Sequence, residues 1–146
     1  MANYLLAIGN TQSVLGDWEA ADNNYIRALE LAELAKDKAL ELKCLINIGR
    51  SFNAAGMYPQ AIKAMGRAIT LSKETGDLVN LASCYNSIGG AHLRLNNYSV
   101  ALEYLQLAFE VNEQLNNKNS MAQNLINMTG IRIDQKDCRH GKFLSI

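Results

Sequence analysis

Apolar residues recur along this chain at intervals of three and four positions, the spacing of one face of an α-helix. In the first stretch they are Tyr4, Leu5, Ile8 and Leu15. The pattern is interrupted at regular intervals by residues that favour helix ends and turns. It therefore predicts helices joined by short turns, over 2–15, 18–35, 38–55, 58–75, 78–95, 98–116 and 118–135.

Two kinds of residue mark the predicted turns. Gly and, after it, Asn adopt the left-handed conformation most readily, so Gly16, Gly76 and Asn96 suit the positions that follow helix ends. Other side chains at the turns can accept hydrogen bonds from the free amide groups of a helix start. These N-cap candidates are Asp17, Asp37, Asp77, Asn97 and Asn117.

The sequence repeats with an interval of 40 residues. Self-similarity at a fixed period indicates stacked supersecondary units. Small residues in both helices of a unit predict that the two helices approach closely, and large residues fill the space between them. The repeated columns are Gly9, Gly49 and Gly89; Ala21, Ala61 and Ala101; Trp18, Tyr58 and Tyr98; and Tyr25, Met65 and Leu105.

The predicted fold class is all-α, an α-solenoid of helix pairs. Its repeats cover 1–40, 41–80 and 81–120, and a single helix over 118–136 caps the open C-terminal end, as solenoids require. The register fails after Lys136, where Cys138 replaces the aromatic residue and Gly141 the alanine. Residues 137–146 are therefore predicted to form an irregular tail.

Composition and charge exclude several function classes. The net charge is zero, from 14 basic and 14 acidic residues, and no segment has the basic stripe of a nucleic-acid binder. No apolar run approaches the roughly 18 residues that span a membrane. The N-terminus lacks the basic and apolar regions of a signal peptide, so a cytoplasmic protein that contacts no membrane is expected.

The cysteines and histidines do not suggest catalysis. Cys44 and Cys84 share one repeat column, where neighbouring helices lie too far apart for a disulfide, and are expected to be small buried residues. Cys138 and His140 offer two metal ligands without a second pair, which is a weak signal. His92 falls in a packing column. We expect no enzyme, no metal and no cofactor.

These columns resemble the tetratricopeptide repeat. The matching features are Ile8-Gly9, Gly16-Asp17-Trp18, Ala21, Tyr25 and Ala28, together with their partners 40 residues on. The period exceeds the family's usual value of about 34 residues, and the usual proline at the repeat end is absent. Such long repeats are similar to those of spindle-orientation adaptors, kinesin light chains and bacterial sensing domains. The resemblance implies a right-handed superhelix whose concave face, lined by the first helix of each pair, binds a peptide or partner helix.

Carried onto this chain, that face predicts a binding site for a protein or peptide partner in a signalling or scaffold protein. Because this face carries the cations Lys43, Arg50 and Arg94, we expect an acidic partner. The alternative interpretation is that these side chains are merely solvated polar surface. Arg50 and its column are not expected to pack between helices. The predicted site residues are Asn10, Lys43, Asn47, Arg50, Asn86 and Arg94.

Two further interpretations concern the partner. Modules that grip the C-terminal carboxylate of chaperones use two Asn and three cations, and here the cation columns hold Leu6, Ser83 and Ser87. Without charged donors the carboxylate would lose its strong hydrogen bonds, so chaperone-tail binding is not expected. The alternative function is a self-associating module, a homodimer formed through the solenoid ends or through Phe143, Leu144 and Ile146.

Overall fold

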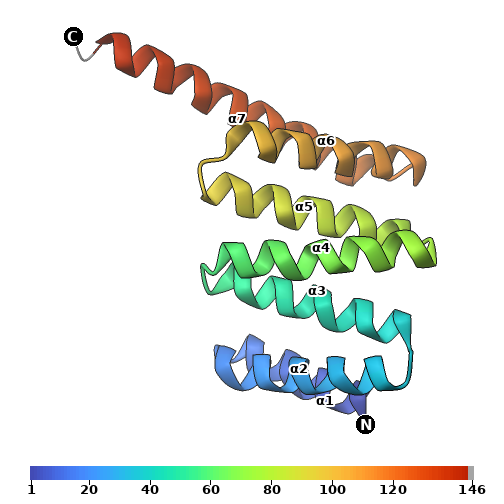
Figure 1. The fold of residues 1–146 in the computed structure, drawn as a ribbon. Helices are drawn as coiled ribbons and strands as arrows, with labels where there is room; N and C mark the ends of the chain where they lie inside the picture. The colour runs from blue at the N-terminus through green and yellow to red at the C-terminus, as the bar shows by residue number, and fades with distance from the viewer. Residues whose placement is uncertain (145–146) are drawn as a thin grey trace.

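The computed structural model describes the backbone of residues 1–144 and the side chains of residues 1–136. Within that backbone the chain is all-α and forms a helical-repeat solenoid, which confirms the predicted fold class (Figure 1). The helices are α1 (Ala2–Val14), α2 (Trp18–Leu34), α3 (Lys38–Ala54), α4 (Tyr58–Thr75), α5 (Leu78–Arg94), α6 (Tyr98–Gln114) and α7 (Lys118–Leu144).

Successive helices stack on one another, so the chain runs from α1 at one end of the molecule to α7 at the other (Figure 1). Contacts also join α1 to α3 and α3 to α5. The first helices of neighbouring repeats thus lie side by side and form one layer, on which the predicted site residues are carried. The second helices α2, α4 and α6 form the other layer.

The helix ends largely follow the predicted turn chemistry. Gly16, Gly76 and Asn96 have positive φ values of 82°, 70° and 61°. Asp37 and Asp77 accept hydrogen bonds from the backbone amides three residues on, at 3.1 and 3.0 Å.

The N-cap prediction is wrong for Asn97. Its side chain makes no cap bond, and its amide nitrogen lies 3.4 Å from Nδ1 of His92. Gly56, with φ of 76°, and two further residues that are not glycine, Lys36 and Asn116, both with φ of 54°, are also left-handed, and the turn pattern does not predict them.

The glycine column confirms the predicted close approach within each pair. A Cβ atom added at Gly9 would lie 2.6 Å from Cε1 of Tyr25, and one added at Gly49 would lie 2.7 Å from Cε of Met65. At Gly89 the nearest atom would be Cγ of Leu105, at 3.1 Å. Each pair therefore closes by placing a large second-helix side chain over a glycine of the first helix.

The predicted irregular tail is wrong as far as Leu144, because α7 continues through it (Figure 1). The segment contains no proline, and its one glycine, Gly141, costs a helix only about 1 kcal/mol. Each residue added to an existing helix forms another backbone hydrogen bond, so loss of the repeat columns does not by itself end the helix. The side chains of Cys138, His140, Phe143 and Leu144, and all of Ile146, lie outside the described residues.

Cys44 and Cys84 are free and buried, as predicted. Burial raises the pKa of each thiol from 9.0 to about 11. The carboxylate of Asp37 adds to the rise in the pKa of Cys44, whereas Arg50 and the hydroxyl of Ser72 partly oppose the rise for Cys84. Both groups therefore stay neutral in the folded protein at pH values where an unfolded chain ionises them.

This shift predicts a loss of stability at alkaline pH. The folded-state pKa is the higher one, so the contribution is complete below pH 9 and is lost as the pH rises towards 11. At pH 10 we expect the free energy of unfolding to fall by on the order of 1 kcal/mol for each thiol. Urea denaturation at pH 8 and pH 10 measures this loss. The Cys44→Ala/Cys84→Ala variant should lose less between the two pH values, and an equal loss in both proteins would contradict the assignment.

Candidate functional site

The predicted site residues lie on one face of the first-helix layer. Asn10 is on α1, Lys43, Asn47 and Arg50 on α3, and Asn86 and Arg94 on α5. Asn10, Lys43, Arg50 and Arg94 are exposed, while Asn47 and Asn86 are half-buried. Because residues three or four apart share a helix face, Lys43, Asn47 and Arg50 follow one another along α3.

Several of these side chains also join neighbouring first helices. Oδ1 of Asn10 accepts hydrogen bonds from the Tyr25 hydroxyl at 2.9 Å and from Nδ2 of Asn47 at 3.1 Å. A guanidinium nitrogen of Arg50 donates to Oγ of Ser83 at 3.2 Å. The expectation that this column does not pack between helices is therefore wrong for Asn10 and Arg50. The reason is that the first helices contact each other directly, so long polar side chains reach the next repeat.

Two hollows open on this face at equivalent positions of successive repeats. The first, of about 430 Å³, lies between α1 and α3, and the second, of about 490 Å³, lies between α3 and α5. Their shared columns are Ser13 and Asn53, Val14 and Ala54, Trp18 and Tyr58, Asn47 and Ser87, Arg50 and Gly90, Ser51 and Ala91, and Ala54 and Arg94. Each hollow thus has one arginine and one aromatic residue of the Trp18 and Tyr58 column, although the arginines come from different columns. Tyr25 also lines the first hollow.

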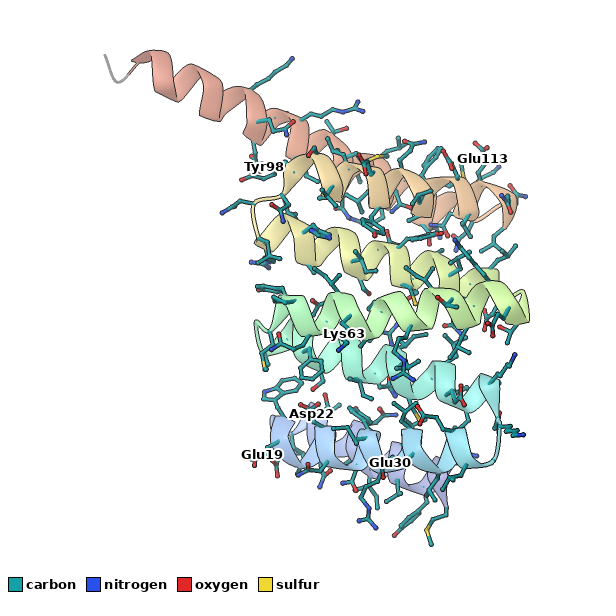
Figure 2. The ribbon with its side chains drawn as sticks, viewed as in Figure 1. Glu19, Asp22, Glu30, Lys63, Tyr98 and Glu113 are labelled. Atoms are coloured by element: carbon teal, nitrogen blue, oxygen red, sulfur yellow. The ribbon has the colours of Figure 1, made fainter. Side chains whose placement is uncertain are left out.

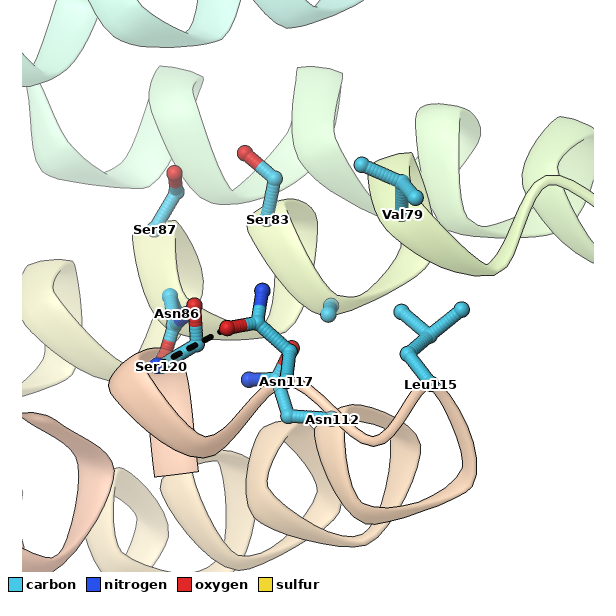
Figure 3. A pocket seen from close by; sticks show the side chains of 9 residues that line it. Val79, Ser83, Asn86, Ser87, Asn112, Leu115, Asn117 and Ser120 are labelled. Carbon is cyan, nitrogen blue, oxygen red and sulfur yellow. Dashed lines mark hydrogen bonds between the residues drawn. The ribbon is translucent and has the colours of Figure 1, made fainter. Parts of the chain in front are cut away.

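A third hollow, of about 330 Å³, lies between α5 and the α6–α7 turn. Figure 3 shows Ser83, Asn86 and Ser87 of α5 on one side of it, and Asn112 and Asn117 on the other. A hydrogen bond of 3.2 Å from the Ser120 amide to Oδ1 of Asn117 closes the turn (Figure 3).

Asn86 belongs to a buried amide network beside this hollow. Nδ2 of Asn112 donates to Oδ1 of Asn124 at 2.9 Å, and Nδ2 of Asn124 donates to Oδ1 of Asn86 at 2.5 Å. The residues one repeat earlier are Ser72, Cys84 and Ile46, so only this junction is built from three amides. Asn86 therefore has a structural role at the α5–α7 junction.

The structure brings three predicted residues, Asn10, Asn47 and Arg50, around the first hollow. Arg94 lines the second and Asn86 the third, while Lys43 lines none of these three. The prediction missed Trp18 and Tyr58, which line the first two hollows. Their shared column is visible in the sequence, where its large residues predict packing between helices, but Trp18 is 37% exposed.

The charges on this face are unpaired within the described part of the chain. The ion pairs found there are Lys38 with Glu74 at 3.2 Å and Arg67 with Glu33 at 3.0 Å. Neither includes Lys43, Arg50 or Arg94, and Arg50 is held by its hydrogen bond to Ser83. The side chains described up to residue 136 contain no group of His, Cys, Asp and Glu that could hold a metal ion. None of the described helices is long and apolar enough to span a membrane.

Comparison with known proteins gives one family and one group of relatives. A family profile described as "Tetratricopeptide repeat" matches residues 1–74 and 53–114. The chain is 33% identical to the human protein "Outer dynein arm-docking complex subunit 4" over an aligned segment of 104 residues. That segment covers 71% of this chain and 15% of the relative. The protein of the same name from Xenopus laevis is 33% identical over 97 residues, covering 66% of this chain and 18% of the relative. The chain therefore spans less than a fifth of these relatives.

Solved structures with the same fold are more distant in sequence. The apo form of RapI superposes with a TM-score of 0.84 at 19% identity, covering 93% of this chain and 50% of that one. The "TPR2AB-domain:pHSP90-complex of yeast Sti1" superposes with a TM-score of 0.80 at 22% identity. This superposition covers 98% of this chain and 50% of that one. At these identities the likeness establishes the fold alone.

Proposed function

Because the chain belongs to the tetratricopeptide-repeat family, whose modules typically bind other proteins and are non-catalytic, we propose that it holds a partner segment along its first-helix face. The segment lies across α1, α3 and α5. The residues that contact it are Asn10, Lys43, Asn47, Arg50, Asn86 and Arg94, with Trp18 and Tyr58 added from the hollows.

The pair of equivalent hollows supports this proposal most directly. Neighbouring helix axes lie roughly 8–10 Å apart, so the two hollows repeat at a spacing of about three extended residues. Trp18 and Tyr58 offer flat apolar walls for two side chains of one extended peptide. Asn and Ser side chains around them can donate to and accept from its backbone.

The unpaired cations give the partner its chemistry. Arg50 lines the first hollow and Arg94 the second, and both lack an ion pair among the described residues. An acidic segment would be attracted to them, with an association rate that falls as salt is added. We therefore propose an acidic partner segment, bound by charge pairs at both hollows.

The relatives suggest a cellular context for this binding. The human relative is by its name a subunit of a docking complex. By analogy, the module would serve to attach one component to another within a larger scaffold or signalling assembly. The long-repeat variant of the family and a cytoplasmic location belong to the same proposal.

Replacing the groove arginine tests the site. We expect Arg50→Ala to weaken partner binding by about 1–3 kcal/mol, because it removes a charged hydrogen-bond donor from the first hollow. Asn47→Ala should weaken it less. Partners captured from the source cell with the wild-type protein would be titrated against each variant by calorimetry, with melting measured in parallel.

Arg27→Ala is the matched control, because Arg27 is an exposed arginine on α2, away from the hollows. It should leave both affinity and melting unchanged. Unchanged affinity in Arg50→Ala and Asn47→Ala, with both proteins still folded, would place the partner on another surface.

Self-association is a second candidate function, favoured by the outer face of α7. Leu125, Ile126 and Ile133 are 50%, 64% and 52% exposed there. Leu125 and Ile126 fall in the columns of Leu45 and Ile46, which are buried where a second helix follows. A dimer seen by light scattering and lost in Leu125→Glu/Ile126→Glu would support this function, whereas a monomer at all concentrations would exclude it.

A further inference from the structure

We propose that the opposite, second-helix side of the molecule holds a separate docking pocket, which takes one large apolar side chain from a partner segment with flanking carboxylates. The pocket has a volume of about 260 Å³ and lies between α2 and α4, over α3. Its lining residues are Ile26, Leu29, Leu45, Ile48, Phe52, Gln60, Lys63, Ala64 and Arg67.

Two residue differences between repeats explain why this pocket is open. The residue 40 positions after Ala64 is Tyr104, and the residue 40 after Phe52 is His92. The Tyr104 ring stacks on His92, with ring centroids 5.7 Å apart and an interplanar angle of 10°. In the next repeat an aromatic side chain of the protein thus fills the space that Ala64 leaves free.

The residues that form the walls of the pocket are apolar and are partly exposed to solvent. Leu29, Leu45 and Ile48 are buried and form its floor, and Phe52 is half-buried beside them. Ile26 at the rim is 43% exposed. Removing such apolar surface from water is favourable. The volume of the pocket equals that of roughly nine water molecules in the liquid, which is enough for one Leu, Phe or Trp side chain.

The rim supplies the charge preference. Lys63 and Arg67 stand one turn apart on α4, and Figure 2 shows Lys63 on the side of the molecule that also carries Glu30 of α2. Arg67 is already paired with Glu33 across the groove at 3.0 Å. Lys63 has no ion pair among the described residues, so it is the cation that a ligand carboxylate meets beside the pocket.

The pocket is independent of the groove proposed above, since none of its lining residues belongs to the three hollows on the first-helix face. Binding there would give the module a second point of attachment on its other face. A substitution that abolishes binding at one of the two sites should therefore leave binding at the other site unchanged.

The test uses a defined peptide, acetyl-Asp-Glu-Phe-Glu-Asp-amide. The peptide is titrated into the full chain, whose Ile and Leu methyl groups are isotopically labelled for NMR. We expect saturable shifts of the Ile26 and Ile48 methyl signals, with a Kd on the order of 1 mM. The peptide with Ala in place of Phe should bind at least tenfold more weakly, and the peptide with Asn and Gln in place of the acids at least threefold more weakly.

Ala64→Tyr is the decisive variant, because the chain itself carries tyrosine at the equivalent position of the next repeat. It should fill the pocket and weaken peptide binding at least tenfold, while Lys73→Ala, which removes an exposed lysine of α4 outside the pocket and the three hollows, should leave binding unchanged. If Ala64→Tyr does not fold, Lys63→Glu, on the exposed rim, should still weaken binding at least threefold. An absence of shifts at Ile26 and Ile48 in the wild-type protein, or full binding by folded Ala64→Tyr, would overturn the proposal.

Discussion

Replacing Asn124 by Ala should lower the free energy of unfolding by about 2–5 kcal/mol. The Asn124 side chain is 1% exposed, accepts from Asn112 at 2.9 Å and donates to Asn86 at 2.5 Å. Truncation leaves one donor and one acceptor unpaired in the α5–α6–α7 junction, each at a cost of about 1–3 kcal/mol. Chemical denaturation of the variant and the wild-type protein measures the difference.

Two further variants separate the loss of the network from the loss of volume. Asn127→Ala is the matched control, since Asn127 is exposed and accepts one bond, from Gln123. It should change stability by less than about 0.5 kcal/mol. The triple variant Asn86→Ile/Asn112→Ser/Asn124→Cys installs the residues found one repeat earlier, removes all three amides together and should recover most of the lost stability. A triple variant as unstable as Asn124→Ala would show that packing volume dominates at this junction.

Replacing Met65 by Ala should cost about 2–5 kcal/mol of unfolding free energy, because Met65 is fully buried and its truncation leaves a cavity. The cavity would open directly over Gly49. A Cβ atom at Gly49 would lie 2.7 Å from Cε and 2.9 Å from Cγ of Met65, and the substitution removes both atoms. Adding Gly49→Ala to Met65→Ala should therefore restore about 1 kcal/mol, since the new methyl group fills part of the cavity and alanine favours the helix.

The sign of Gly49→Ala should reverse in the wild-type background. There the methyl group overpacks a filled site, at a cost of about 1–3 kcal/mol that exceeds the gain in helix propensity. Gly66→Ala is the control, because a Cβ atom at Gly66 meets nothing within 4 Å. This substitution should stabilise the wild-type protein and the Met65→Ala variant by the same amount. Equal effects of Gly49→Ala in the two backgrounds would refute the contact between this glycine and Met65.

Much of this architecture could be predicted from sequence because its determinants are local or periodic. Helical spacing, left-handed residues such as Gly16 and caps such as Asp37 act within a few positions of the chain. The columns of Gly49 and Met65 recur at the repeat interval, so three copies reveal which positions must be small and which large. The fold class and the pairing of helices follow from these patterns.

The candidate site was only partly predictable. A helix face can be assigned from spacing, and the structure places Asn10, Asn47 and Arg50 around one hollow. Periodicity cannot show that Trp18 is partly exposed while lining that hollow, since exposure depends on how far neighbouring repeats separate. The groove residues themselves remain a prediction until a partner is bound.

The sequence by itself determined the helices, their turns and the small and large columns, because these depend on near neighbours and on repetition. The tertiary structure alone decided which repeat junctions are filled and which are open. Asn124 meets Asn86 and Asn112 only when α7 packs on α5 and α6, and Ala64 leaves a pocket only because Leu45 and Phe52 lie beneath it. Such contacts join residues that are distant along the chain, and their geometry depends on the placement of whole helices.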